Sequence, residues 1–172
     1  LALDDLPAGM PAFQPYATAI RPAVIPASEG EWKEALRDGL AAAVRRQLMA
    51  DVPVGSLLSG GVDSTVITRL MRDSLPEPPA AFGIGFDSEP DGGELANARR
   101  AATALGVPLA EVRVSDAEYR AAWPAHAARL GEPIANSGVL LVGMLCAEVR
   151  KTHKVVLTGQ GADEPLGGYP RH

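Results

Sequence analysis

Residues 58–64 read Leu-Ser-Gly-Gly-Val-Asp-Ser, and this stretch is the most informative part of the sequence about the fold. The residues before it, 52–58, form an apolar run with β-branched valines, which predicts a strand buried on both faces, as in a parallel sheet. The residues after it, 64–72, carry apolar side chains at helical spacing. The stretch therefore joins a buried strand to a helix, the position at which α/β sheets bind ligands.

Further short strands and helices alternate on both sides of this unit. The expected strands are residues 80–86, 109–114 and 154–157, and the expected helices are residues 29–50, 94–105, the segment after Asp116, and 138–150. Ser28 with Glu31 forms a candidate capping box for the first helix, Gly106 is expected to stop the helix 94–105, and Asp116 is expected to cap the next. The alternation predicts an α/β class with a mostly parallel sheet flanked by helices.

Composition and charge narrow the class of protein. The chain has 172 residues, of which 47% are hydrophobic and 22% charged, which suits one domain with a sizeable core. The net charge of −5 argues against nucleic acid or an anionic membrane as partner. The single cysteine, Cys146, excludes an intramolecular disulfide, fits a reducing compartment and is expected in the core. No apolar run reaches the roughly 18 residues that span a bilayer, and we expect a cytoplasmic protein.

The glycines and serines of residues 58–64 suit a phosphate or pyrophosphate group. Glycine lets backbone N–H groups approach an anion, the Ser59 and Ser64 hydroxyls are donors, and the helix N-terminus adds a positive dipole end. No Lys follows the glycines, so this is not the Gly-x4-Gly-Lys-Ser/Thr loop, and the Gly-x-Gly-x-x-Gly of dinucleotide folds is also missing. A bare Gly-Gly would more often be a tight turn with Ser or Asp as helix cap.

Residues 58–64 resemble the pyrophosphate-binding motif of the PP-loop ATP pyrophosphatases. Together with residues 51–55 and Thr65, they resemble the synthetase domain of glutamine-dependent asparagine synthetases. A second segment agrees, because residues 156–164 with Gly167-Gly168-Tyr169 are similar to the Ser-Gly-Glu-Gly-Ala/Ser-Asp-Glu…Gly-Gly-Tyr signature of that family. Residues 82–86, Glu94 and residues 132–133 fit the family pattern between the two motifs.

The resemblance implies a PP-loop, or adenine nucleotide alpha hydrolase-like, fold and a division of the chain. Residues 1–28 contain five prolines and read as a linker or as the end of a missing glutaminase domain, because residues 6–9 are similar to the Leu-Pro-Pro-Gly near the close of that domain. Residues 29–172 then form the N-terminal part of the ATP-binding domain, truncated on its C-terminal side. The amidase nucleophile and downstream catalytic residues lie outside the 172 residues, so the segment alone is expected to be inactive.

The resemblance also assigns roles to individual residues. Residues that would bind ATP are Leu57, Ser59, Gly60, Gly61, Asp63, Ser64, Ile84, Thr158 and Gly159. Asp63 and Asp163 match Mg2+-binding carboxylates, which suit the negative charge that builds as pyrophosphate leaves. Asp163 and Gln160 match catalytic positions, but the family usually has Glu at the position of Gln160, and Gln cannot act as a carboxylate base. The plainer alternatives are a helix cap for Asp63 and core packing for Leu57 and Ile84.

The function implied is that of an ATP-dependent amide-forming ligase, an amidotransferase of the asparagine synthase type. It would bind ATP and Mg2+, adenylate a carboxylate and release pyrophosphate, after which ammonia or an amine displaces AMP. Aspartate is the family's acid, and glutamine supplies its ammonia. Gln160 leaves open an amide- or lactam-forming relative in secondary metabolism. A non-catalytic nucleotide-binding module and a homodimer also stay open, whereas His126 and His153 lack partners at metal-ligand spacing.

Overall fold

The computed structural model describes residues 26–89, 93–131, 136 and 138–168. The chain divides into two compact units, residues 1–36 and 37–172, which we describe separately. Helix α1, Glu29–Gln47, begins in the first unit. The Ser28 hydroxyl accepts a hydrogen bond from the Glu31 N–H at 3.3 Å, and the Glu31 carboxylate accepts one from the Ala27 N–H at 2.7 Å. The Ser28 half of the expected capping box is therefore present, but Glu31 reaches back one residue further than expected.

The second unit is built on a sheet of four parallel strands in the order β3-β2-β1-β4. The strands are β1 (Val54–Leu57), β2 (Ala81–Phe86), β3 (Leu109–Val114) and β4 (Val155–Leu157). The chain moves outward from β1 through β2 to β3 and then returns to place β4 on the other side of β1. The strand order therefore reverses between β1 and β4. Such a switch point is where open α/β sheets bind ligands, at the carboxyl edge of the sheet.

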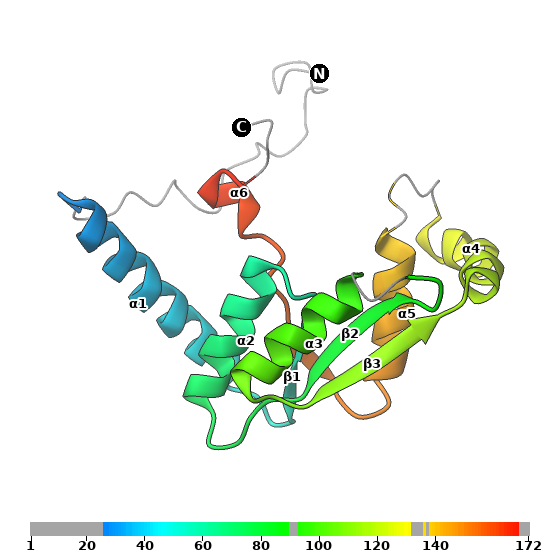
Figure 1. Ribbon diagram of the computed structural model, residues 1–172, viewed down its shortest axis with the longest axis horizontal. Helices are drawn as coiled ribbons and strands as arrows, with labels where there is room; N and C mark the ends of the chain where they lie inside the picture. The colour runs from blue at the N-terminus through cyan, green and yellow to red at the C-terminus, as the bar shows by residue number, and fades with distance from the viewer. Residues whose placement is uncertain (1–25, 90–92, 132–135, 137, 169–172) are drawn as a thin grey trace, which may run out of the picture. The chain divides into compact units, whose positions relative to one another are not determined.

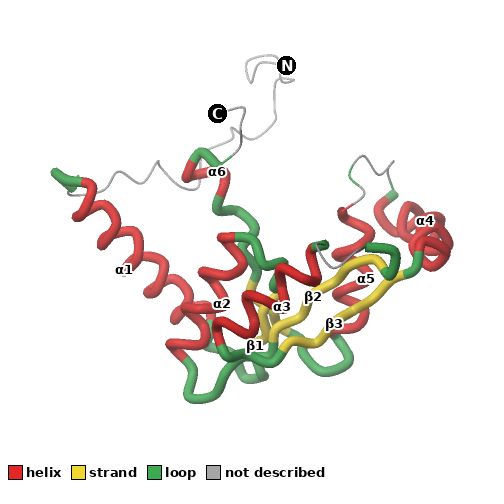
Figure 2. Tube along the Cα trace, in the orientation of Figure 1, coloured by secondary structure: helices red, strands yellow, loops and turns green. Residues whose placement is uncertain are grey.

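Helices cover both faces of this sheet (Figures 1 and 2). Helices α2 (Val62–Ser74) and α3 (Glu94–Leu105) pack on one face, where a core cluster joins Leu58 and Ala81 to Ala98 and Ala102. On that face the buried Ser56 hydroxyl of β1 lies 2.6 Å from the Thr68 hydroxyl of α2. Helix α5 (Gly138–Val149) packs on the other face through a cluster of Phe82, Leu145 and Val149. The expected α/β architecture is confirmed.

Two further helices complete the second unit. Helix α4 (Asp116–Leu130) is capped by Ser115, whose hydroxyl accepts from the Glu118 N–H while the Glu118 carboxylate accepts from the Ser115 N–H. The expectation that Asp116 is the cap was wrong by one residue, because the reciprocal Ser115–Glu118 pair satisfies two N–H groups at once. A single helical turn, α6 (Asp163–Leu166), follows β4 and was not expected.

The element boundaries agree with the expected ones to within a few residues. Helix α3 and strand β3 have the expected bounds, and Gly106 ends α3 in the left-handed conformation, as expected. Helix α2 begins at Val62, two residues earlier than expected. Cys146 lies exposed on α5, so its expected place in the core was wrong. Within the ranges that the structure describes, every helix is too short or too polar to cross a bilayer.

Candidate functional site

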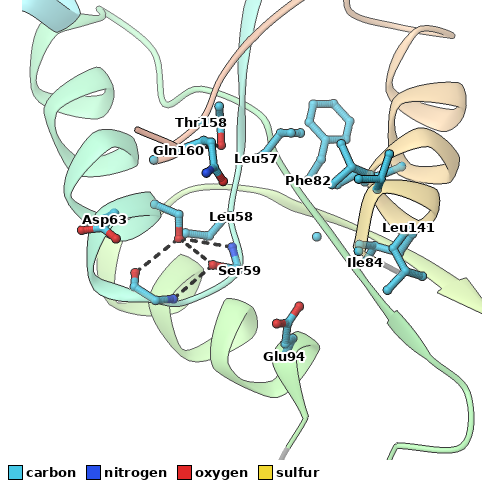
Figure 3. Close-up of a pocket in the computed structure, with 18 of the residues that line it drawn as sticks. Leu57, Leu58, Ser59, Asp63, Phe82, Ile84, Glu94, Leu141, Thr158 and Gln160 are labelled. Atoms are coloured by element: carbon cyan, nitrogen blue, oxygen red, sulfur yellow. Dashed lines mark hydrogen bonds between the residues drawn. The ribbon is translucent and has the colours of Figure 1, made fainter. Parts of the chain in front are cut away.

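A pocket of about 690 Å³ opens at the carboxyl edge of the sheet, beside the ends of β1, β2 and β4 (Figure 3). Two loops form its polar side: the first loop, residues 58–64, follows β1, and the second loop, residues 158–162, follows β4. Side chains of β1, β2 and α5 form its apolar side. The residues that border it are Leu57, Leu58, Ser59, Gly61, Asp63, Ser64, Phe82, Gly83, Ile84, Glu94, Asn136, Gly138, Val139, Leu141, Val142, Leu145, Thr158, Gly159, Gln160, Gly161 and Asp163.

The first loop is held by hydrogen bonds within itself, drawn as dashed lines in Figure 3. The hydroxyls of Ser59 and Ser64 lie 3.0 Å apart, the Ser59 N–H donates to the Ser64 hydroxyl, and the Gly61 N–H donates to the Ser59 hydroxyl. The Thr65 N–H makes the first helical bond of α2, to the Gly61 carbonyl, and no side chain caps this helix. The N–H groups of the first turn of α2 therefore remain available to an anion.

Gly60 sets the path of the first loop against α3. Its φ of +81° lies in the left-handed region that favours glycine. A Cβ at this position would lie 2.6 Å from the Ala98 nitrogen and would also collide with the carbonyl carbon of Asn97. Only glycine lets the loop pass this close to α3, so Gly60 has a structural reason to be present. It does not border the pocket.

The second loop packs against the end of the first loop, where α2 begins. A Cβ at Gly159 would lie 2.5 Å from the Ser64 nitrogen and 2.7 Å from the Asp63 carbonyl carbon, so the backbone of Gly159 fits directly against the start of α2. Within the loop, the Gln160 N–H donates to the Thr158 hydroxyl at 3.3 Å. Gly161 turns the chain with a φ of +95° before Asp163 begins α6. Residues about a hundred positions apart in sequence thereby meet at one edge of the sheet.

Three carboxylates border the pocket: Asp63 in the first turn of α2, Asp163 at the start of α6, and Glu94 at the start of α3. Across the ranges with described coordinates, no three His, Cys, Asp or Glu side chains come close enough to form a metal cage. Asp63 and Asp163 still suit Mg2+, which is usually bound through one or two carboxylates together with substrate phosphates. The residues present therefore fit an ion that arrives with a nucleotide.

A partly exposed ion pair outside the pocket links α3 to the sheet. Arg99 of α3 donates to both carboxylate oxygens of Glu111 on β3, at 2.5 and 2.7 Å. This hydrogen-bonded contact lowers the pKa of Glu111 and outweighs the opposing effect of its burial. Helix α3 carries Glu94 and also the backbone of Asn97 and Ala98, against which Gly60 packs. The Arg99–Glu111 pair therefore helps to position one wall of the pocket.

The structure brings together nearly all of the residues assigned from the sequence. Of the nine residues expected to bind ATP, all except Gly60 border the pocket, and Gln160 and Asp163 border it as well. Asp63 does not cap α2, since Gly61 holds the cap position, so the alternative role as a helix cap is excluded. Sequence reasoning missed Glu94, Asn136 and the α5 side chains as pocket residues. Glu94 carried a signal, because it opens a helix that directly follows a strand of the same parallel sheet.

The comparisons with known proteins show which family the chain is similar to. The family model described as asparagine synthase matches residues 35–172. "Asparagine synthetase [glutamine-hydrolyzing] 1" of Bacillus subtilis is 33% identical over 134 residues, which cover 78% of this chain and 21% of that protein. "Amidase chyE" of Penicillium rubens is 33% identical over 164 residues, covering 83% of this chain and 23% of that protein. The sequence thus spans only about a fifth of the length of these relatives.

Among solved structures, the glutamine-dependent NAD+ synthetase of Acinetobacter baumannii in complex with ADP is similar. The TM-score is 0.55 at 20% sequence identity, and the match covers 85% of this chain and 29% of that chain. This likeness concerns the fold. It confirms the PP-loop type of α/β architecture expected from residues 58–64.

Proposed function

The chain belongs to the asparagine synthase family, and from that membership we propose that it binds ATP with Mg2+ and adenylates a substrate carboxylate, releasing pyrophosphate. Ammonia or an amine then displaces AMP and forms an amide. The protein would thus be an ATP-dependent ligase. The observation that carries the proposal is the uncapped start of α2 behind the first loop, in one pocket with Asp63 and Asp163.

In this proposal the first loop binds the pyrophosphate part of ATP. Ser59, Gly61 and Ser64 offer hydroxyl or N–H donors, and the positive end of the α2 dipole faces the phosphates. Gly60 does not border the pocket, but it still contributes to phosphate binding in this proposal, because its backbone conformation sets the direction of the loop. The serine hydroxyls now bond to each other, and they would exchange that bond for phosphate oxygens when ATP binds.

The adenosine part would lie along the apolar side of the pocket. Leu57 and Ile84 lie on that side in Figure 3, and Thr158 and Gly159 border it from the second loop. Leu57 and Ile84 also pack on the core cluster around Phe82, so core packing and nucleotide contact are compatible at these positions. An ADP-bound NAD+ synthetase of the same fold is in keeping with a nucleotide in this region.

Asp63 and Asp163 would hold Mg2+ together with phosphate oxygens. When bound, the ion neutralises the negative charge that develops as pyrophosphate departs. The two carboxylates follow different strands, β1 and β4, and reach the same pocket because these strands are neighbours in the sheet. Asp163 also matches a catalytic position of the family, which this role explains.

For the substrates, we propose aspartate as the acid and ammonia from glutamine as the nitrogen donor, in keeping with the glutamine-hydrolysing relative. The second candidate is an amide- or lactam-forming ligase that acts on a different acid. Gln160 favours this candidate, because it borders the pocket where the family usually has Glu. The relative named as an amidase is in keeping with it too.

The test is a product analysis with the full-length protein, ATP, Mg2+, ammonium chloride and a panel of acids that includes aspartate. We expect AMP and pyrophosphate in amounts that depend on the acid, together with its amide. Aspartate as the best acid would support asparagine formation, and a different best acid would support the second candidate. ADP and phosphate as products, or no turnover with any acid, would contradict adenylation.

A further inference from the structure

We propose that Glu94 is the catalytic base that accepts the proton of the attacking amine, an inference that rests on the proposed function. Glu94 is the first residue of α3 and borders the pocket. Figure 3 shows its carboxylate across the gap from Ser59, with Ile84 and Leu141 on the neighbouring wall. In the sequence, Glu94 is the first residue of an expected helix and fits the family pattern, but neither observation gives it a chemical role.

The Glu94 carboxylate has no partner that would occupy it. Among the described residues, no hydrogen bond or ion pair involves its side chain. Structural carboxylates of this chain behave differently: Glu111 binds Arg99 and Glu118 binds Ser115. Glu94 is exposed to solvent at the pocket edge. A free carboxylate there attracts a positively charged group, such as the nitrogen of an attacking amine.

The remaining ionisable side chains at the pocket are already engaged in the proposed reaction. Its described lining contains Asp63, Glu94 and Asp163 as titratable groups and holds no Lys, Arg or His. Asp63 and Asp163 are proposed for Mg2+, and Gln160 can hydrogen-bond but cannot take up a proton as a carboxylate does. Glu94 does not join the two aspartates in a three-residue cluster, so it is free for a separate task.

The step balances without a further reagent. The amine nitrogen uses its lone pair to form a C–N bond with the acyl carbon of the adenylate, and the carbonyl π electrons move to oxygen. The nitrogen becomes acidic as this bond forms, and Glu94 takes one of its protons. The carbonyl then re-forms, the C–O bond to AMP breaks and AMP leaves with the electron pair. Glu94 returns its proton to water.

A competing explanation is that Glu94 only stabilises α3. An acidic side chain in the first helical turn interacts favourably with the helix dipole. The two explanations differ in what they affect, because a dipole contact changes the stability of the helix and a base changes one step of the reaction. The test must therefore separate amide formation from folding and from adenylation.

The experiment compares two nucleophiles in the full-length protein with ATP, Mg2+ and aspartate as the acid. Both nucleophiles must lose a proton from nitrogen after they attack the adenylate. Hydroxylamine is much the weaker base, so water can take its proton as it traps the acyl group, whereas the adduct of ammonia needs a stronger acceptor such as a carboxylate. We expect Glu94→Gln to lower ammonium-dependent amide formation by about 10²–10⁴-fold and to leave hydroxamate formation unchanged. Glu94→Asp should keep part of the amide activity. Added acetate should restore part of it to Glu94→Ala.

The matched control is Glu77→Gln, which changes an exposed carboxylate outside the pocket, between α2 and β2. It should match the wild type with both nucleophiles. Equal losses of amide and hydroxamate in Glu94→Gln would show a role in binding or adenylation and overturn the assignment as base. Undiminished amide formation would overturn it as well. If the wild type forms no hydroxamate with aspartate or with any other acid of the panel, the proposed adenylation fails, and the assignment of Glu94 fails with it.

Discussion

The first and second loops border the same pocket, but they are held in different ways. The first loop follows the central strand β1 and has its own network of hydrogen bonds among Ser59, Gly61 and Ser64. The second loop follows β4, a three-residue strand that pairs only with β1 among the described strands, and has a single internal bond, from Gln160 to Thr158. The first loop is therefore held by its own hydrogen bonds, whereas the second depends on its contact with the first.

A substitution at Gly159 is the most direct test of whether the position of the second loop depends on its contact with α2. In Gly159→Ala the new Cβ would meet backbone atoms of Asp63 and Ser64, which cannot give way as a flexible side chain can. We expect the second loop to separate from α2, with a loss of stability of about 1–3 kcal/mol or more and loss of measurable ATP binding. Chemical denaturation and calorimetry with ATP and Mg2+ would measure the two effects.

Gly39→Ala is the matched control for this prediction. Gly39 lies within α1 and a Cβ there meets nothing within 4 Å, so alanine should stabilise the helix by about 1 kcal/mol. If Gly159→Ala binds ATP as the wild type does, the second loop does not depend on its contact with α2.

The buried Ser56–Thr68 pair tests the support of the first loop alone. Thr68→Val keeps the shape of the side chain but removes its hydrogen bonds to the Ser56 hydroxyl and the Ser64 carbonyl. Leaving a buried hydroxyl without a partner should cost about 1–3 kcal/mol of stability, measured by urea denaturation. Thr68→Ser should retain most of the stability. Equal midpoints for Thr68→Val and the wild type would mean that this pair does not hold α2 to β1.

The two loops should act on one magnesium site. We expect Asp63→Asn and Asp163→Asn each to weaken Mg2+-dependent ATP binding, and the double variant to be little worse than either single one. The coupling energy should be about 0.5–3 kcal/mol, measured by calorimetry as a double-mutant cycle. Strictly additive losses would assign the two aspartates to separate sites and remove the shared-metal proposal.

The smallest effect is expected outside both loops, at the Arg99–Glu111 pair. Because Arg99 lowers the pKa of Glu111 in the folded state, the pair stabilises the fold above the ordinary value of 4.5. That contribution is lost as pH falls through the lowered pKa. Partial exposure limits it to less than about 1 kcal/mol. Urea denaturation from neutral to acidic pH should show a shallower acid loss in Glu111→Gln than in the wild type or in Glu77→Gln; identical slopes would contradict this prediction.

The difference between the loops also explains what could be predicted from the sequence. The first loop lies in contiguous residues, so Ser59 and Ser64 could be assigned as donors to a phosphate from the order of amino acids alone. The role of Asp63 came from the resemblance to the family. The second loop has no local pattern that places it beside the first, and its assignment came from the resemblance of residues 156–164 to a family. The α5 side chains could not be assigned to the pocket, because they reach it only through the crossover between β3 and β4.

Two smaller expectations, the burial of Cys146 and the cap of α4, were also wrong because they depend on contacts that the local sequence pattern does not show. Cys146 was expected in the core because α5 is apolar around most of its circumference, yet only one face of a helix can pack on a sheet. Ser115 rather than Asp116 caps α4, because the hydrogen bond depends on the reciprocal partner Glu118, three residues further along the chain. Spacing predicts that an element exists more reliably than it predicts its last residue.

The register between β1 and β4 has a consequence for the order of folding. Val54 pairs with Val155, so roughly a hundred residues of chain must be gathered before this pairing can form. The unit of β1, α2 and β2 is local in sequence and can form first, whereas parallel pairing over such a separation is slow. The pocket between the two loops is therefore completed in a late step. A ligand that binds only the finished pocket would favour the docked form of β4 and slow its local opening.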